Sequence, residues 1–333
     1  ANTTGTGNVA VGTSSLDANT TGDYQVAVGR NALGVNTTGG NNTAVGDSAL
    51  AANTTASNNT SVGYASLIAN TTGTRNVAVG ALTLDANTTG VDNVGVGESA
   101  LTASTTASNN TAVGSGALNA NTTGASNTGI GRAALVANTT ASNNTSVGHF
   151  SLVANTTGTE NVAVGVTAGG STTTGSNNTY IGYDSGASAT TNNNNTSVGS
   201  HTLQDNTGSN NTAIGTDALK ENTTGGSNVA VGRQAGLNST TGSSNTFVGH
   251  GAGESNAGAS NSVAVGRSAL ASQHTNGANV AVGNSAGAGI TTGTQNTFVG
   301  SVAGDAMTTS NNNTAIGYQA LTSGTTGYEN YAG

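Results

Sequence analysis

Few side chains in this 333-residue chain could carry out catalysis. The chain has four histidines, fourteen Asp and Glu residues in total and no cysteine. Histidines and carboxylates act as general bases and metal ligands only where several of them meet in one site. The histidines are His149, His201, His250 and His274, and the acidic residues are scattered. We therefore expect isolated surface residues, with no enzyme activity, no cofactor and no metal site.

Composition excludes two classes of partner. Nucleic-acid binding needs a basic surface, which six Lys and Arg residues in a chain of net charge −8 cannot supply. A membrane-spanning helix needs about 18 consecutive apolar residues, and the sequence has no such run.

The Gly225-Gly226 segment lacks the Gly-Lys-Ser/Thr ending of a phosphate-binding loop, so we interpret it as a turn.

A repeat determines which elements position these residues. A Val or Ile followed by Gly recurs nineteen times, and seventeen of the eighteen intervals are 17 residues long, while one is 16. The glycines are Gly12, Gly29, Gly46, Gly63, Gly80, Gly97, Gly114, Gly131, Gly148, Gly165, Gly182, Gly199, Gly215, Gly232, Gly249, Gly266, Gly283, Gly300 and Gly317. Such a period is typical of a solenoid, in which each repeat is one rung stacked on the last. We number every rung so that this Gly is position 5.

Each rung is predicted to contain one short strand at positions 2–4. Position 2 is Val or Thr and position 4 is Val or Ile in all nineteen rungs, which favours a strand. Gly at position 5 and the common Asn-Thr-Thr-Gly at positions 12–15 are typical of corners, and the absence of Pro fits uninterrupted backbone ladders. We therefore predict an all-β fold, a parallel β-solenoid (β-roll) of about nineteen 17-residue rungs. Residues 1–333 should form one continuous domain that starts and ends mid-rung.

Two positions in the rung exchange volume. Position 9 is Leu in thirteen rungs and Gly in six, and the six form adjacent pairs: Gly169 and Gly186, Gly236 and Gly253, Gly287 and Gly304. Position 3 is small except at Tyr180, Phe247 and Phe298, each in the second rung of one pair. We interpret this as one ring filling the space of two Leu side chains, so positions 3 and 9 should touch. The predicted structural core includes Val45, Gly46, Leu50, Tyr180, Phe247 and Phe298.

The strand is predicted to be packed on both faces. Position 3 points to one face, and the β-branched residues at positions 2 and 4 point to the other. We infer that one face lines the interior of the solenoid and that the other meets a second layer, formed by another copy of the chain. The expected partner is thus the chain itself, in a homotrimer or an end-to-end filament.

Position 6 varies freely and is predicted to be exposed. Arg30 and Asp47 occupy this position in adjacent rungs and could form an ion pair. Candidate surface contacts at the same position are Tyr64, His149, Tyr183, His250 and Tyr318. Exposed Tyr and His side chains could stack on surface glycans, although a variable solvated row explains them more simply.

Threonines and Asn-x-Thr motifs suggest two other surface roles. Thr occupies positions 13 and 14 in most rungs, which raises an ice-binding hypothesis, but adjacent residues should point to opposite faces. Asn-x-Thr acceptor sites for glycosylation recur at two places in the rung, as at Asn53 and Asn87 and as at Asn41 and Asn58. Turn chemistry alone also accounts for both sets.

The strand motif resembles that of a known repeat type. Residues 42–46 read Asn-Thr-Ala-Val-Gly, similar to the head repeats of trimeric autotransporter adhesins, and residues 313–321 resemble repeats of phage and bacterial tail-fibre-like proteins. The likeness covers the whole chain, although adhesin head repeats are typically shorter than 17 residues. It implies a homotrimer of parallel β-rolls, located outside the cell, on the cell surface or on a virion.

These observations predict a structural protein: the shaft or head of an extracellular or virion-associated fibre, with a possible adhesive role. A self-stacking filament subunit is the first alternative. An ice- or glycan-binding solenoid is the second.

Overall fold

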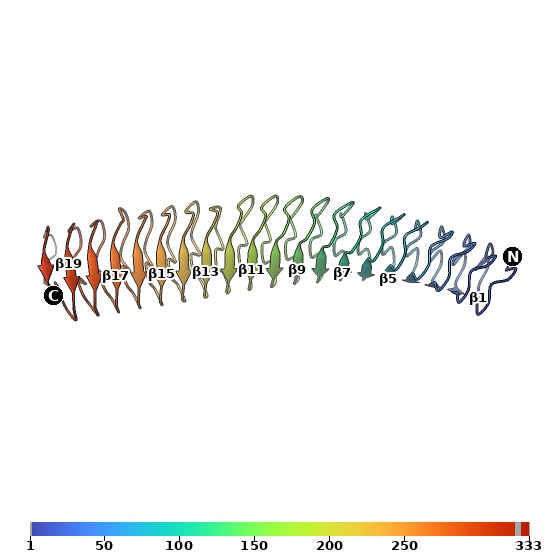
Figure 1. Cartoon of the computed structure of the whole chain (residues 1–333), viewed down its shortest axis with the longest axis horizontal. Coiled ribbons are helices and arrows are strands. Elements are labelled where there is room, and N and C mark those ends of the chain that lie inside the picture. The colour runs from blue at the N-terminus through green and yellow to red at the C-terminus, as the bar shows by residue number, and fades with distance from the viewer. Residues whose placement is uncertain (1, 324–327, 333) are drawn as a thin grey trace. The chain divides into compact units, whose positions relative to one another are not determined.

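The structure is a computed structural model that describes residues 2–323 and 328–332. The described residues are all-β, and they contain no helix that could span a membrane. The chain divides into two compact units, Ala1–Val166 and Thr167–Gly333. Within each unit the strands lie side by side as the rungs of a parallel β-solenoid, each strand followed by corners that lead to the next (Figure 1).

Strands β1 to β19 cover positions 2–4 of their rungs, as predicted, and the two-residue β20 covers positions 2 and 3. The strands of the first unit are β1 (Val9–Val11), β2 (Val26–Val28), β3 (Thr43–Val45), β4 (Thr60–Val62), β5 (Val77–Val79), β6 (Val94–Val96), β7 (Thr111–Val113), β8 (Thr128–Ile130), β9 (Thr145–Val147) and β10 (Val162–Val164). Those of the second unit are β11 (Thr179–Ile181), β12 (Thr196–Val198), β13 (Thr212–Ile214), β14 (Val229–Val231), β15 (Thr246–Val248), β16 (Val263–Val265), β17 (Val280–Val282), β18 (Thr297–Val299), β19 (Thr314–Ile316) and β20 (Tyr331–Ala332).

The strands pair in parallel and in register, so that each position of the rung faces the same position of the next. For example, Val26, Ala27 and Val28 face Thr43, Ala44 and Val45. The 16-residue rung keeps this register, because Thr196 faces Thr212. Its missing residue falls in the corner at residues 206–208, where a shorter turn leaves the strands unshifted.

The interior of each rung is lined by positions 3, 8 and 9. Away from the terminal rungs these residues are buried, as Ala44, Ala49 and Leu50 show. Leu50 has a φ of 51°, in the left-handed region, and the other Leu residues at position 9 share this conformation. A left-handed backbone costs a residue other than Gly about 1–2 kcal/mol, so Leu is retained there for the core volume that it fills.

Gly at position 5 is required for two reasons. Gly46, for example, has a φ of 141°, and a Cβ added to it would lie 2.3 Å from the carbonyl oxygen of Gly63 in the next rung. The corner therefore needs both a left-handed backbone and a close approach of adjacent rungs, and Gly allows both. Gly46 thus belongs to the packed structure, as the sequence indicated.

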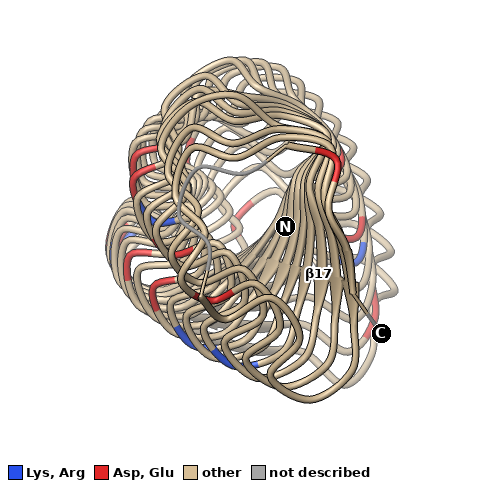
Figure 2. Cartoon of the chain, turned by 90° about the vertical axis from the view of Figure 1, so that its left-hand side faces the viewer, with Lys and Arg blue, Asp and Glu red and all other residues tan. Residues whose placement is uncertain are grey.

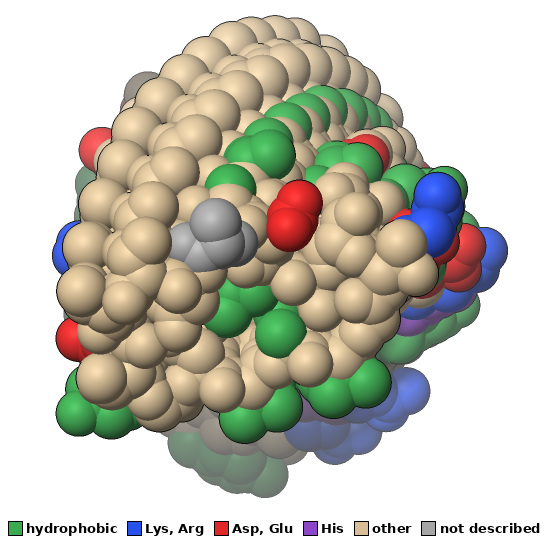
Figure 3. Space-filling view, turned by 90° about the vertical axis from the view of Figure 1, so that its right-hand side faces the viewer, with side chains coloured by type: hydrophobic (Ala, Val, Ile, Leu, Met, Phe, Trp, Pro, Cys, Tyr) green, Lys and Arg blue, Asp and Glu red, His purple; other side chains and the backbone are tan. Residues whose placement is uncertain are grey.

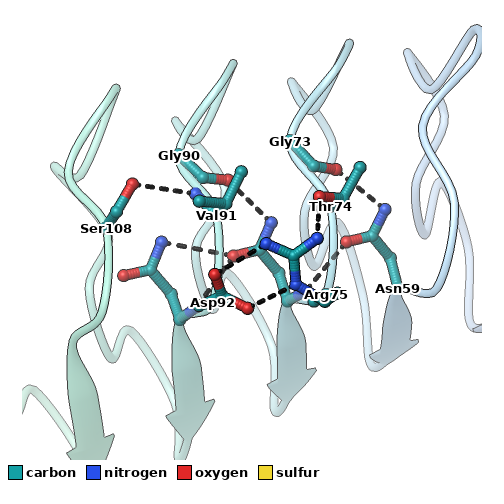
Figure 4. A network of polar contacts seen from close by, with 10 residues as sticks. Asn59, Gly73, Thr74, Arg75, Gly90, Val91, Asp92 and Ser108 are labelled. Carbon is teal, nitrogen blue, oxygen red and sulfur yellow. Dashed lines mark hydrogen bonds and ion pairs between the residues drawn. The ribbon is translucent and has the colours of Figure 1, made fainter.

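Two ladders of buried asparagines tie the rungs together. At position 1, the amide of Asn59 donates to the carbonyl of Gly73 (2.9 Å), and its oxygen accepts from the backbone N–H of Asn76 in the next rung (2.9 Å) (Figure 4). At position 12, the amide of Asn53 donates to Asn36 Oδ1 (2.9 Å) and to the carbonyl of Ala56 (3.0 Å). These bonds satisfy polar groups that would be costly to bury alone.

The second ladder is interrupted where the core changes. Position 12 is Asn in ten of the thirteen rungs with Leu at position 9 but in only one of the six with Gly there. The replacements in the Gly rungs are Thr172, Ala189, Ser239, Ile290 and Met307, all buried. An aromatic ring at position 3 therefore coincides with changes at position 12 as well as at position 9.

The placement of Val45 in the core is wrong. Ala44 is fully buried, whereas Val45 is only half-buried on the outer face of the sheet. The physical reason is strand alternation: the interior accepts position 3, so positions 2 and 4 must point outward.

Candidate functional site

The aromatic residues predicted for the core lie in the interior. Tyr180, Phe247 and Phe298 are fully buried. A Cβ added to Gly236 or to Gly253 would approach ring atoms of Phe247 at 2.8 Å and 2.4 Å. Around Phe298 the corresponding approaches are 2.7 Å from Gly287 and 2.4 Å from Gly304. Positions 3 and 9 therefore touch within a rung and between neighbouring rungs, and neither Gly could carry a side chain beside the ring.

Tyr180 places a hydroxyl in this interior. A Cβ on Gly186 would lie 2.3 Å from its ring. Burial raises the pKa of Tyr180 far above its usual value, and the nearby Thr172 hydroxyl lowers that pKa by a smaller amount. The phenol thus stays protonated at any ordinary pH, which makes it a neutral packing group rather than a base.

The five candidate contact residues at position 6 are all exposed. Tyr64, Tyr183 and Tyr318 leave 52% to 73% of their surface open to solvent, and His149 and His250 are also exposed. They are distributed over both units and do not converge on one cleft. In the space-filling view most of the visible surface is uncharged, and charged side chains appear at several separate places (Figure 3).

The predicted ion pair between Arg30 and Asp47 is present. Arg30 Nη2 lies 2.8 Å from Asp47 Oδ2. A second pair, which the sequence reasoning missed, joins Arg75 and Asp92 at position 17 of adjacent rungs, with Arg75 Nε 2.6 Å from Asp92 Oδ1 (Figure 4). In each pair the hydrogen bond from the guanidinium holds the pKa of the carboxyl below its usual range. The sequence could have predicted this pair too, because Arg75 and Asp92 are 17 residues apart, as Arg30 and Asp47 are.

The histidines make only local contacts. Arg132 Nη1 lies 3.3 Å from His149 Nε2, and Arg233 Nη1 lies 3.4 Å from His250 Nε2. His201 Nδ1 lies 3.9 Å from Asp217 Oδ1, and His274 is exposed. Among the described residues, no three His, Asp or Glu side chains are grouped in a way that could hold a metal ion.

The two sets of Asn-x-Thr motifs differ in accessibility, which the sequence did not show. Asn53 and Asn87, at position 12, are fully buried with their amides hydrogen-bonded. Asn41 and Asn58, at position 17, are exposed and have φ values of 58° and 64°. In the folded chain only the second set presents its amides to solvent.

The threonine rows do not form one double-row face. The hydroxyl at position 13 donates to the carbonyl of the next rung, as from Thr20 to Thr37 (2.9 Å), and these residues are mostly half-buried. Position 14, as at Thr21, is exposed. The hydroxyls at position 13 are therefore engaged in holding the stack.

The outer face of the sheet carries similar residues in every rung, unlike the variable row at position 6. In β1 to β19, positions 2 and 4 point outward, and they carry only Val, Thr and Ile. Ile130 and Val248 remain 38% and 36% exposed. Figure 2 shows the charged residues, in red and blue, on only some of the corner segments. We call the side chains at positions 2 and 4 the outer sheet face.

No family model, no curated protein and no solved structure matches this chain.

Proposed function

We propose that this chain is a structural segment, the shaft or head of an extracellular or virion-associated fibre. The observation that supports this most is the repetition of the same bonds between rungs. Backbone, Asn and Thr hydrogen bonds join each rung to its neighbours within a unit, as Asn36, Asn53 and Asn70 illustrate. Such a stack can be lengthened by adding rungs, and it resists local opening because each rung is held on both sides. The resemblance to adhesin-head and tail-fibre repeats supports the location.

The outer sheet face supports assembly with further copies of the chain, as in the proposed homotrimer. It is free of charge, and large exposed apolar surfaces mark association sites. If each side chain at positions 2 and 4 offers roughly 50 Å², ten strands present about 1,000 Å², which exceeds the roughly 800 Å² per partner of a standard interface.

Light scattering of the whole chain tests this proposal. We expect a defined oligomer that three Val→Lys substitutions at position 4 (V45K, V62K and V113K) convert to a monomer. Lys at exposed position 14 (T38K, T55K and T123K) serves as the matched control and should leave the mass unchanged. A monomeric parent chain would contradict the homotrimer, and protease cleavage within the rungs of the oligomer would contradict a mechanical role.

The alternatives predict different results. A self-stacking filament subunit should give continuous density across chain ends in electron micrographs. An ice- or glycan-binding solenoid should produce thermal hysteresis or a signal on a glycan array.

A further inference from the structure

Three basic side chains stand in line in the second unit. Arg233, His250 and Arg267 occupy position 6 of consecutive rungs, and all three are exposed. Their backbone is held in register, because the N–H of Gly251 donates to the carbonyl of Arg233 (3.0 Å) and the N–H of Ser268 donates to that of His250 (2.9 Å). At about 4.8 Å per rung, the Cα atoms of the two arginines lie about 10 Å apart. We call these three residues the basic row.

The basic row concentrates charge in a chain that has little. Only five residues are Arg, and Arg30 and Arg75 each pair with an Asp of the next rung. In the described part of the chain, neither Arg233 nor Arg267 forms an ion pair. Glu254 belongs to the same rung as His250, and its Oε2 would lie 3.2 Å from a Cβ on Gly251. No ion pair within the described part of the fold therefore accounts for these two arginines.

We propose that the basic row binds an acidic polysaccharide, through sulfate or carboxylate groups spaced along its chain. Arginine presents a planar fork of donors that matches these oxyanions, and two such forks stand two rungs apart on a rigid backbone. The row runs along the stack, so an extended polymer can lie on it.

The neighbours of the basic row favour a polysaccharide over a nucleic acid. Binding of single strands relies on aromatic side chains on which bases stack. Position 7 of the three rungs carries Gln234, Gly251 and Ser268, and position 6 of the flanking rungs carries Thr216 and Asn284. None of these is aromatic, and two arginines neutralise few phosphates.

The first unit contains a natural comparison. Arg132 and His149 repeat the Arg–His contact at 3.3 Å, against 3.4 Å for Arg233 and His250. There, however, the Arg132 guanidinium lies over the ring of Phe150, 5.4 Å from its centroid, and position 6 of the next rung is Val166. An arginine that is engaged by a ring, with no second arginine two rungs away, should bind anions much less well.

Binding of labelled oligosaccharides to the whole chain tests the proposal. The probes are a heparin fragment for sulfate, an alginate fragment for carboxylate, neutral dextran and single-stranded DNA, at low and at physiological salt. We expect one or both acidic oligosaccharides to bind, R267S to weaken that binding about tenfold and R233S/R267S to abolish it. R132S is the matched control and should change the affinity less than twofold. These side chains are exposed, so circular dichroism should show all variants folded.

The four probes distinguish the possible ligands. Heparin binding alone assigns a sulfated ligand, and alginate binding alone assigns a uronic acid polymer. Absence of binding to both, binding unaffected by R233S/R267S, or equal binding of DNA would overturn the proposal. The structural role proposed above does not depend on this row, since the oligomeric mass should be the same in R233S/R267S as in the parent chain.

Discussion

Phe247 lies directly against Gly253: a Cβ on this Gly would come within 2.4 Å of two ring carbons. The same ring also excludes a side chain at Gly236 in the preceding rung. The interior of the solenoid therefore accepts two packing solutions, which are Leu at position 9 with a small residue at position 3, or one ring with two glycines. Both fill the rung, which is what close packing of a protein interior requires.

Removal of the Phe247 ring should lower the stability of the chain, and Leu at the two glycine positions should restore it. Phe247→Ala is expected to destabilise the chain by about 3–5 kcal/mol, because it leaves a cavity in a fully buried site. The triple variant F247A/G236L/G253L restores the combination found in the thirteen Leu rungs, and it should recover most of the loss. Urea denaturation followed by circular dichroism measures both effects. A neutral F247A, or a triple variant no more stable than F247A, would contradict the exchange.

The Asn ladder should be equally sensitive to apolar substitution. Asn53→Leu removes the amide that Asn36 Oδ1 accepts from, and so leaves that buried oxygen without its donor. We expect a loss of about 1–3 kcal/mol. Asn58→Ser, at the exposed position 17, is the control, because Ser126 occupies that position in another rung. Equal thermal unfolding midpoints for the two variants would show that the ladder contributes little.

The strand positions could be predicted because Val, Thr and Ile recur with a fixed period. The contact between positions 3 and 9 could be predicted because the residue types at these two positions change together. Val45 could not be placed correctly from its type, since a β-branched residue suits a strand whichever face it occupies. The asparagines at positions 1 and 12 resembled turn residues. Only in-register stacking makes identical amides neighbours, and this allows Asn to be buried at almost every rung. Side-chain direction at the corners therefore required the structure.

Contacts between surface residues could be predicted from the repeat period. Arg30 and Asp47 could be paired from their 17-residue separation, because the period converts sequence distance into spatial contact. The same rule applies to Arg233 and Arg267: the residues 17 positions away are Thr216, His250 and Asn284, and none of them is acidic.

Asp85 should destabilise the chain at neutral pH. Burial raises its pKa, and among the described residues its Oδ1 has no hydrogen-bond partner. Asn119, at the same position 10, donates its amide to the carbonyl of Ser99 in the preceding rung (3.1 Å). Asp85→Asn would allow the equivalent bond to the carbonyl of Ala65, which a carboxylate cannot make.

The sign of the pH dependence follows from the raised pKa. A carboxyl whose pKa is higher in the folded state favours folding when protonated, and that contribution is lost as the pH rises through the folded-state value. D85N should therefore melt higher than the parent chain at pH 7, with the difference shrinking as the pH falls through the raised folded-state pKa and smallest below about 4. Asp17→Asn, at the same position in the first rung and exposed, is the control. A difference that grows in acid would contradict the assignment to burial.

The Arg75–Asp92 pair should show the opposite dependence. Its guanidinium lowers the pKa of Asp92, so the stabilisation is present above the unfolded-state pKa and is lost as the pH falls through the lower folded-state value. Arg75→Gln is expected to lower the melting temperature slightly at pH 7, and the difference should disappear below about pH 3 and in about 1 M salt. Both groups are exposed, so the effect is small. Differential scanning calorimetry of R75Q and of the double variant R75Q/D92N measures it. If R75Q alone and the double variant differ from the parent by the same amount at pH 2.5 as at pH 7, the loss comes from packing at the corner and not from the ion pair.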